Sequence, residues 1–305
     1  NKYSVDLLAA INGSPTQGFG YTTLMTNNGK MVNRGVEITL SGEIIRQKDF
    51  SWNASLLYAF NRNKVKHISV QPSLWDSRIS MPTSYPMVGK PLYGIYAYKW
   101  AGLNENGDPQ VYDAENNVTS GPARDYHALV YCGTTVPIHN ASLTNVLRYK
   151  GFEFSAMLIL DAGHKLRSSN IPSINMSNGR ITSTAKGIVD RWTQPGDVTD
   201  VPRLLFSNDT ENFNTHRTEL YRYSDLFVYD ASNIRLSNIS LAYRVPAHWC
   251  KKISLSGARL QFNVENVATF AFDSKANYDL GGKVKPNYVW GSVSYTHLRA
   301  HETSQ

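Results

Sequence analysis

Hydrophobic and polar residues alternate along several long stretches of the chain. Residues 258–266 (ARLQFNVEN) are the clearest example, with apolar Leu260, Phe262 and Val264 alternating with polar Gln261, Asn263 and Glu265. Successive side chains of a strand point to opposite faces, so this pattern predicts a strand with one apolar and one polar face. The pattern recurs at residues 36–45, 50–60, 152–160 and 229–246. The sequence therefore predicts an all-β protein built from long strands.

The connections between these stretches fall into two length classes. Residues 46–49, 149–151 and 246–252 are short, whereas residues 66–92, 102–140 and 162–215 are long and rich in Asn, Gly, Pro, Ser and Asp. Such long loops are uncommon in compact soluble domains. Short turns on one side and long loops on the other are typical of outer-membrane barrels, whose strands need ~9–11 residues to span the bilayer. An antiparallel transmembrane β-barrel is therefore favoured. A soluble extracellular β-sandwich that binds carbohydrate is the alternative, because sandwiches also alternate.

Residues 229–246 (YDASNIRLSNISLAYRVP) contain a change of phase. One face, which we assign to lipid, carries Ile239, Leu241, Tyr243 and Val245, and the other, which we assign to the lumen, carries Asn238, Ser240, Ala242 and Arg244. Ile234 and Leu236 have the opposite parity. A β-bulge, or emergence of the strand above the bilayer, would explain this slip. Pro246 then ends the strand at a short turn, where no backbone donor is needed.

Composition narrows the class of protein further. The chain has 18 Tyr, 11 Phe and 6 Trp, and Tyr and Trp suit boundaries between an apolar and a wet environment. The net charge of +7 comes from scattered Lys and Arg, so no nucleic-acid partner is expected. No apolar run approaches the ~20 residues of a spanning helix. The two cysteines, Cys132 and Cys250, are interpreted as free thiols in preference to a disulfide.

Residues 1–15 (NKYSVDLLAAINGSP) contain neither an initiator Met nor a signal peptide. We expect either an intracellular protein or a fragment of a longer one.

Six segments in succession resemble the SusC/RagA family of TonB-dependent outer-membrane receptors from Bacteroidetes. VGKPLYGIYAYKWAGLNENGDPQVY (88–112) is similar to a family segment that ends in Gly-Asp-Pro, and RWTQPGDVTDVPRL (191–204) is similar to its Arg-Trp-x-x-Pro-Gly-Asp-x-Thr-x-x-Pro loop. The other four similar segments are residues 27–38 followed by 48–65, residues 143–158, residues 229–246 and residues 260–270, and Val267 stands where the family usually has Leu.

This resemblance implies that residues 1–292 are the C-terminal part of a large barrel, without the plug and the last strand. It implies a location in the outer membrane of a Gram-negative bacterium and import of glycan or peptide fragments. The implied partners are a SusD-like surface lipoprotein, outer-membrane lipid and the TonB complex, which acts through an N-terminal region that is absent here. A TonB-dependent receptor for siderophores or vitamins is the alternative within the same class.

The end of the chain departs from the family. Residues 293–303 (VSYTHLRAHET) fit a reading frame of a transposase sequencing adapter, so we interpret residues 293–305 as a non-native tail. His297 and His301 lie four residues apart in this tail, and two ligands alone do not make a closed zinc site. No metal site is expected.

Three segments carry candidate binding residues. Trp75, Asp76 and Arg78 combine an aromatic ring with two charges that suit a sugar, although an ordinary ordered loop is the favoured interpretation. The polar positions Gln261, Asn263 and Glu265 would face the lumen, as a wet wall or as contacts for a passing solute. Asn104, Asn106 and Asp108 have the spacing of a calcium loop, but a plain turn at Gly107 is favoured. Asp197 is interpreted as the anchor of a turn.

No catalytic motif is present. The sequence lacks a Gly-x-Ser-x-Gly elbow and a His-Glu-x-x-His pair, and its histidines are scattered. We therefore expect neither an enzyme nor a cofactor.

Overall fold

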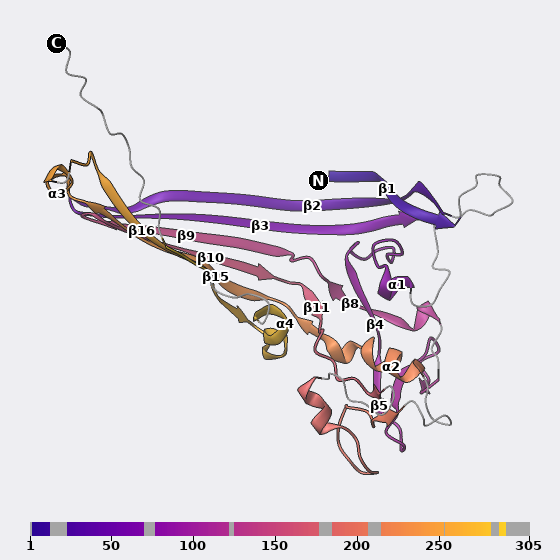
Figure 1. Ribbon diagram of the computed structural model, residues 1–305. Coiled ribbons are helices and arrows are strands. Elements are labelled where there is room, and N and C mark those ends of the chain that lie inside the picture. Colours follow the sequence, from indigo (N-terminus) through magenta and orange to yellow (C-terminus); the bar gives the residue numbers. More distant parts are fainter. Residues whose placement is uncertain are drawn as a thin grey trace. The chain divides into compact units, whose positions relative to one another are not determined.

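The computed structural model describes residues 2–12, 23–69, 77–121, 125–176, 185–206, 215–252, 254–281 and 287–290. The longer strands are β1 (Lys2–Asn12), β2 (Thr23–Arg46), β3 (Phe50–Ile68), β9 (His139–Tyr149), β10 (Phe152–Ala162), β15 (Asn233–Val245) and β16 (Ala258–Ala271). The shorter strands are β4 (Gly94–Tyr98), β5 (Trp100–Leu103), β6 (Pro109–Tyr112), β7 (Val118–Thr119), β8 (Leu129–Thr134), β11 (Lys165–Arg167), β12 (Asn175–Met176), β13 (Leu205–Phe206), β14 (Val228–Asp230) and β17 (Asn287–Trp290). The α-helices are α1 (Ser77–Ser80), α2 (Thr215–Arg222), α3 (Ala247–Lys252) and α4 (Asn277–Gly281). Strands predominate, which confirms the all-β prediction (Figure 1). The predicted tail, residues 293–305, lies outside the described residues.

The long strands form one sheet. Among the described residues it has eight strands in the order β1-β2-β3-β9-β10-β15-β16-β17, and neighbours pair antiparallel, as in β9 with β10 and β10 with β15. Each strand therefore follows its neighbour in sequence order without a crossover. A Greek-key sandwich would reorder its strands. An up-and-down order is that of a barrel wall, and the described part of that wall is open.

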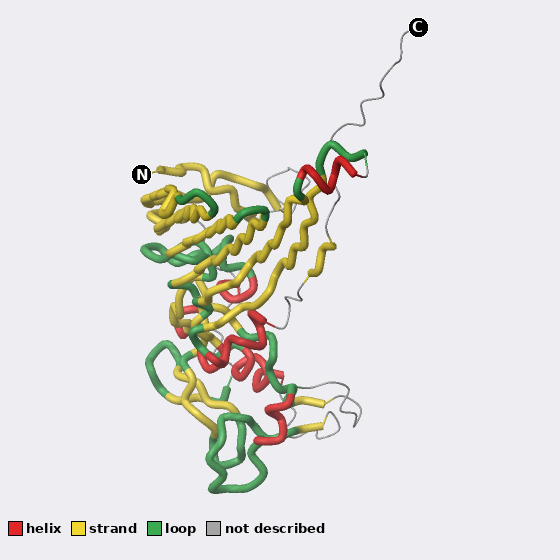
Figure 2. Tube along the Cα trace, turned by 90° about the vertical axis from the view of Figure 1, so that its left-hand side faces the viewer, coloured by secondary structure: helices red, strands yellow, loops and turns green. Residues whose placement is uncertain are grey.

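Two of the three predicted short connections are tight turns. Residues 47–49 join β2 to β3, and Lys150 and Gly151 join β9 to β10. Lys150 has a φ of 52°, a left-handed conformation that is uncommon for residues other than glycine. The third connection is longer than predicted, because β16 begins only at Ala258 and α3 lies between (Figure 2). Pro246 precedes this helix, and its carbonyl oxygen accepts hydrogen bonds from the backbone N–H groups of Trp249 and Cys250.

The change of phase in residues 229–246 is a β-bulge. The register of β15 shifts between Leu236 and Asn238 against both of its neighbours, β10 and β16. On β16, Asn266 takes a φ of 53° at the same level. An extra residue turns the following side chains to the other face, and this explains why Leu236 and Ile239 are both apolar.

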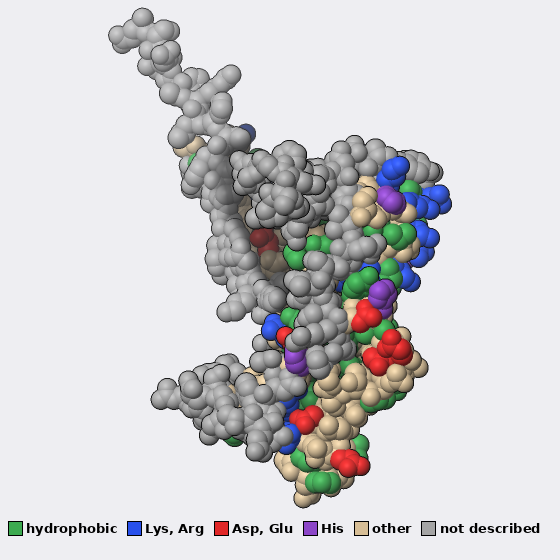
Figure 3. Space-filling view, turned by 90° about the vertical axis from the view of Figure 1, so that its right-hand side faces the viewer, with side chains coloured by type: hydrophobic (Ala, Val, Ile, Leu, Met, Phe, Trp, Pro, Cys, Tyr) green, Lys and Arg blue, Asp and Glu red, His purple; other side chains and the backbone are tan. Residues whose placement is uncertain are grey.

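The chain divides into two compact units. Unit 1 is Asn1–Gly35, Asn61–Pro137 and Gly163–Ala231, and unit 2 is Val36–Phe60, Ile138–Ala162 and Ser232–Gln305. Unit 2 holds most of the long paired strands. Unit 1 holds the long connections, which are not plain loops: they contain the small sheets β4-β8, β5-β6-β7, β11-β14 and β12-β13. Apolar and charged side chains are interspersed on the side drawn in Figure 3.

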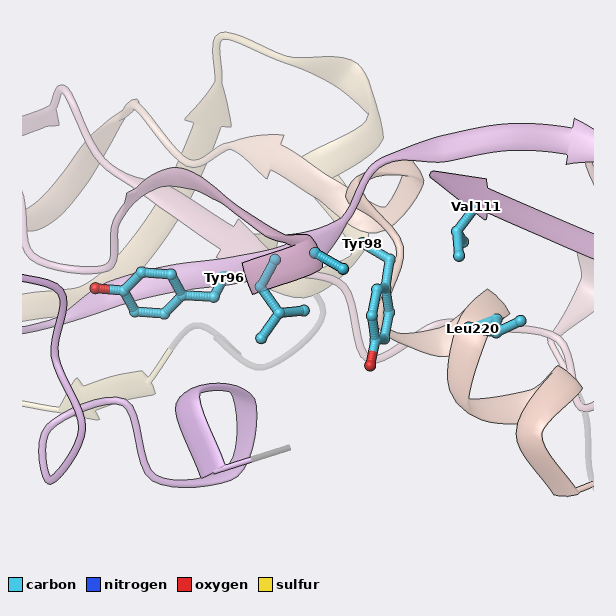
Figure 4. Packing of buried hydrophobic residues seen from close by; sticks show 6 residues of the cluster. Tyr96, Tyr98, Val111 and Leu220 are labelled. Atoms are coloured by element: carbon cyan, nitrogen blue, oxygen red, sulfur yellow. The ribbon is translucent and has the colours of Figure 1, made fainter. Parts of the chain in front are cut away.

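A hydrophobic core explains why unit 1 is ordered. Tyr96 and Tyr98 of β4, Val111 of β6 and Leu220 of α2 are almost fully buried together (Figure 4). All five residues of β4 are buried. A strand that is buried on both faces has no polar alternation, so the alternation that predicted the long strands did not predict this one.

Candidate functional site

The apolar face of the long strands in unit 2 is exposed. Leu40 of β2 is 61% exposed and Leu260 of β16 is 56% exposed. The other large hydrophobic side chains exposed on these strands include Val36, Ile38, Leu56, Phe152, Phe154, Leu158 and Leu241. Soluble monomers rarely expose so continuous an apolar surface, whereas the outer surface of a membrane barrel requires it.

A row of aromatic side chains and one aromatic pair mark the two ends of this apolar face. Near the tight turns, the register aligns Phe50, Tyr149, Phe152 and Tyr243 across β3, β9, β10 and β15, and the rings of Phe152 and Tyr243 are 4.5 Å apart. Ten residues further along β3, on the same face, Phe60 packs against His139, with ring centroids 5.3 Å apart. With a rise of ~3.4 Å per residue and a tilt of ~40°, this separation gives a band about 25 Å tall. Such a band matches the apolar height of outer-membrane barrels.

The predicted lumen residues share the opposite face. Gln261, Asn263 and Glu265 of β16 pair with Ala242, Ser240 and Asn238 of β15. Nε2 of Gln261 donates hydrogen bonds to Oγ of Ser240, at 3.2 Å, and to Oδ1 of Asn263, at 3.0 Å, and Glu265 is exposed. The structure thus brings these three residues together as a polar strip.

Of the other predicted binding group, Trp75, Asp76 and Arg78, the structure describes only Arg78. Trp75 and Asp76 lie outside the described residues. Arg78 lies in α1, and its guanidinium carbon is 4.5 Å from the ring centroid of Tyr126, a stacking distance for a cation and an aromatic ring. The ring of His127 is 4.1 Å from that of Tyr126. Sequence spacing could not identify Tyr126, because it is distant in the chain.

The segment with the spacing of a calcium loop is a turn, and the side chain of Asn104 already accepts hydrogen bonds within it. Oδ1 of Asn104 accepts hydrogen bonds from the backbone N–H groups of Asn106 and Asp108. Gly107 has a φ of 73°, and a Cβ atom there would overlap the ring of Trp192. The structure therefore supports the plain turn and explains why glycine occupies its tip. Asp197 also anchors a turn as predicted, accepting bonds from the N–H and hydroxyl of Thr193 and the N–H of Gln194.

An ion cluster that the sequence did not reveal surrounds Asp108. Arg203 donates two hydrogen bonds to its carboxylate, at 3.0 and 2.9 Å, and Nε of Arg217 donates a third, at 3.0 Å. The side chain of Arg217 is only 4% exposed. It also donates to Asn175 Oδ1 and to the carbonyl oxygen of Arg203. Asp108 therefore joins three distant segments of unit 1.

Burial and charge oppose each other at this cluster. Burial lowers the pKa of Arg217 below its usual value, and the neighbouring Asp108 carboxylate opposes this shift only in part. A buried cation is tolerated only when a counter-charge and hydrogen bonds replace water. The cluster is therefore a structural clamp rather than an open site.

The described residues contain no group of three or more His, Cys, Asp and Glu side chains that could hold a metal ion. Likewise, no helix in the described part of the chain is long and apolar enough to cross a membrane.

The curated proteins to which this chain is similar are all of one kind, as the following comparisons show. No family model matches the chain. It is 25% identical over 303 residues to TonB-dependent receptor P3 of Formosa agariphila, covering 92% of this chain and 29% of that protein. It is 22% identical over 263 residues to TonB-dependent receptor SusC of Bacteroides thetaiotaomicron, covering 82% of this chain and 24% of that protein. Among solved structures, the RagAB peptide transporter matches with a TM-score of 0.66 and 20% identity over 89% of this chain and 29% of that one, which shows a shared fold.

The exposed apolar face and these relatives indicate the class: the chain resembles part of a TonB-dependent receptor. Within that class it is SusC-like. It spans about 29% of the length of the receptor P3.

Proposed function

We propose that this chain forms wall and loops of a SusC-like, TonB-dependent importer in the outer membrane. The observation that carries this proposal is the exposed apolar face of unit 2, bounded by an aromatic row and the Phe60–His139 pair about 25 Å away. A surface of this kind is stable against hydrocarbon and costly against water. The polar strip on the opposite face would then line the wet interior.

The proposed solutes are glycan or peptide fragments, captured together with a SusD-like lipoprotein and moved with energy from TonB. SusC is among the relatives, and RagAB is described as a peptide transporter. Both likenesses support a role in import. The relatives are receptors and transporters, which supports a role without catalysis.

In this proposal the two units have separate tasks. Unit 2 contributes the wall, and its Gln261, Asn263 and Glu265 meet water or the passing solute. Unit 1 contributes folded loops, whose order rests on the Tyr96 core and the Asp108 clamp. Arg78 and Tyr126 belong to these loops and are the solute contacts proposed for unit 1.

This function can be tested by measuring solute uptake in a bacterial strain that carries an in-frame deletion of the gene. Cells would receive fluorescent oligosaccharides, fluorescent peptides or a siderophore complex, with and without the gene restored on a plasmid. We expect the deletion to abolish uptake of the oligosaccharides or the peptides and to leave the siderophore unaffected. Loss of siderophore uptake alone would favour the alternative receptor, and unchanged uptake of all three would contradict import.

A further inference from the structure

A small basic pocket lies at the turn end of the polar face in unit 2. It has a volume of about 110 Å³ and is bordered by the β9–β10 turn, β15 and β16. Its charged lining consists of Arg148, Lys150, Glu153, Arg244 and Arg259. Four cations therefore surround one carboxylate.

Glu153 is saturated by two of these cations. Its Oε2 accepts from Nε of Arg148 at 2.7 Å, and its Oε1 accepts from an Nη of Arg259 at 3.0 Å. Both carboxylate oxygens are thus used. The positive charges of Arg244 and Lys150 are left without compensation by Glu153.

Arg244, whose side chain is exposed, adds a like charge beside Arg259. Arg244 of β15 stands directly opposite Arg259 of β16 in the register, and like charges directly opposite each other destabilise a sheet. Lys150 adds a third positive charge from the turn. Its ammonium group lies 5.3 Å from the ring of Tyr149, a contact that leaves its charge in place.

Small side chains keep the pocket open. Ala242 is 3% exposed and stands between Glu153 and Gln261 in the register, and Gly151 contributes no side chain. The volume is well below the ~300–1,000 Å³ of sites for organic ligands. It suits one compact charged group, and guanidinium groups match the oxygens of phosphate.

We propose that this pocket binds a phosphate group on the polar face of the wall. The group comes either from free phosphate in the surrounding solution or from the headgroup of a phospholipid. Binding offsets the repulsion between Arg244 and Arg259, with Lys150 as a further cation. The proposal rests on β9, β10, β15 and β16 alone and does not depend on which solute is imported.

Two variants remove free cations without disturbing the Glu153 ion pairs. Arg244→Gln removes the charge opposite Arg259. Lys150→Asn removes the turn charge and keeps a residue that tolerates a positive φ. Lys252→Asn, an exposed lysine of α3 outside the pocket lining, is the matched control.

The experiment uses the full receptor purified in detergent, with folding checked by circular dichroism. Inorganic phosphate is titrated by calorimetry at constant ionic strength, and short-chain phosphatidylglycerol is titrated by native mass spectrometry. We expect Arg244→Gln to weaken binding at least ~tenfold and Lys150→Asn to weaken it less, because an arginine gives bidentate bonds and a lysine a point charge. The Lys252→Asn variant should bind as the unaltered receptor does.

The two probes also separate the sources. Binding of inorganic phosphate that Arg244→Gln weakens supports a free anion, and binding of the lipid alone with the same sensitivity supports a headgroup. Absence of both from the unaltered receptor would overturn the proposal. So would equal binding by the unaltered receptor and Arg244→Gln.

Discussion

Asp108 holds together segments of unit 1 that lie far apart in the chain. Its carboxylate takes three hydrogen bonds from Arg203 and Arg217. The backbone N–H of Arg203 also donates to the carbonyl oxygen of Gly107 at 3.0 Å. The carboxylate of Asp108 therefore connects the segment that follows Gly107 to Arg203 and to the start of α2.

Replacing Asp108 with Asn should destabilise unit 1 by about 3 kcal/mol, because Arg217 would remain buried without its counter-charge. Hydrogen exchange followed by mass spectrometry should show faster exchange in β6 and α2. Asp190→Asn, at an exposed position, should leave exchange unchanged. Equal exchange in both variants would show that Asp108 is not a clamp.

Cys132 provides a second prediction at the scale of one residue. Burial, with a smaller contribution from Asp225, raises the pKa of its thiol to about 11. The thiolate is the reactive form, so alkylation by iodoacetamide at pH 8 should be roughly 100-fold slower than for an unperturbed cysteine. The rate should rise about tenfold per pH unit up to the pKa of the thiol.

Mass spectrometry of the labelled peptides would measure this rate. Cys250, which has no exposed surface, should remain unlabelled until the protein unfolds. Rapid labelling of Cys132 at pH 8 would contradict the expected shift. Both cysteines are free thiols in the structure.

The sequence predicted residues that form a local turn better than residues that come together from distant segments of the chain. Asn104, Gly107 and Asp197 act within a few residues of their own positions, so their spacing was informative. The partners of Asp108 and Arg78 lie in other segments of the chain. Their proximity depends on how unit 1 folds, and no local pattern encodes it.

The bulge is the main irregularity among the elements. It lies where β15 shifts register between Leu236 and Asn238 and where Asn266 of β16 has a positive φ. Without it, the apolar residues on the two sides of the shift would face opposite ways. The bulge thus keeps one continuous apolar face on β15.

Asn266 should therefore tolerate glycine but not valine. A β-branched residue at a left-handed position should cost about 1–2 kcal/mol, whereas Asn266→Gly should be close to neutral. Urea unfolding in detergent would measure both variants. If Asn266→Val were as stable as Asn266→Gly, the left-handed backbone at this position would be wrong.

The sequence predicted the long strands because each has one apolar face, and the change of phase made a bulge one of two explanations that it offered. It did not predict β4, since that strand is buried on both faces. It also missed α3 within the connection that it treated as short. A helix of six residues has too few turns for its periodicity to stand out.

At the scale of the whole molecule, the exposed apolar face of unit 2 favours a hydrocarbon environment over water. Apolar residues at alternate positions of β3, β9, β10, β15 and β16 share it through the register. The polar residues between them share the other face. The up-and-down order of the strands is the remaining evidence against a soluble sandwich.

A charge should therefore be tolerated on one face and not on the other. Leu158→Arg, in the middle of the apolar face and 37% exposed, should cost about 2–4 kcal/mol in a bilayer. Ser155→Arg, on the polar face of the same strand, should cost much less. Folded protein in the outer-membrane fraction would be compared by heat-modified mobility on gels, and equal yields would contradict a lipid-facing assignment for Leu158.

The distance between the aromatic row and the Phe60–His139 pair determines which bilayers suit this wall. An apolar height of about 25 Å is shorter than the ~30 Å hydrocarbon core of an average bilayer, and the bacterial outer membrane is thinner than average. In reconstituted vesicles, lipids with long acyl chains would have to thin around Phe50 and Phe60, at a cost for every ångström of mismatch. The protein should therefore insert most readily into bilayers of short-chain lipids. The distance between Phe50 and Phe60 on β3 would determine which membrane thickness suits it.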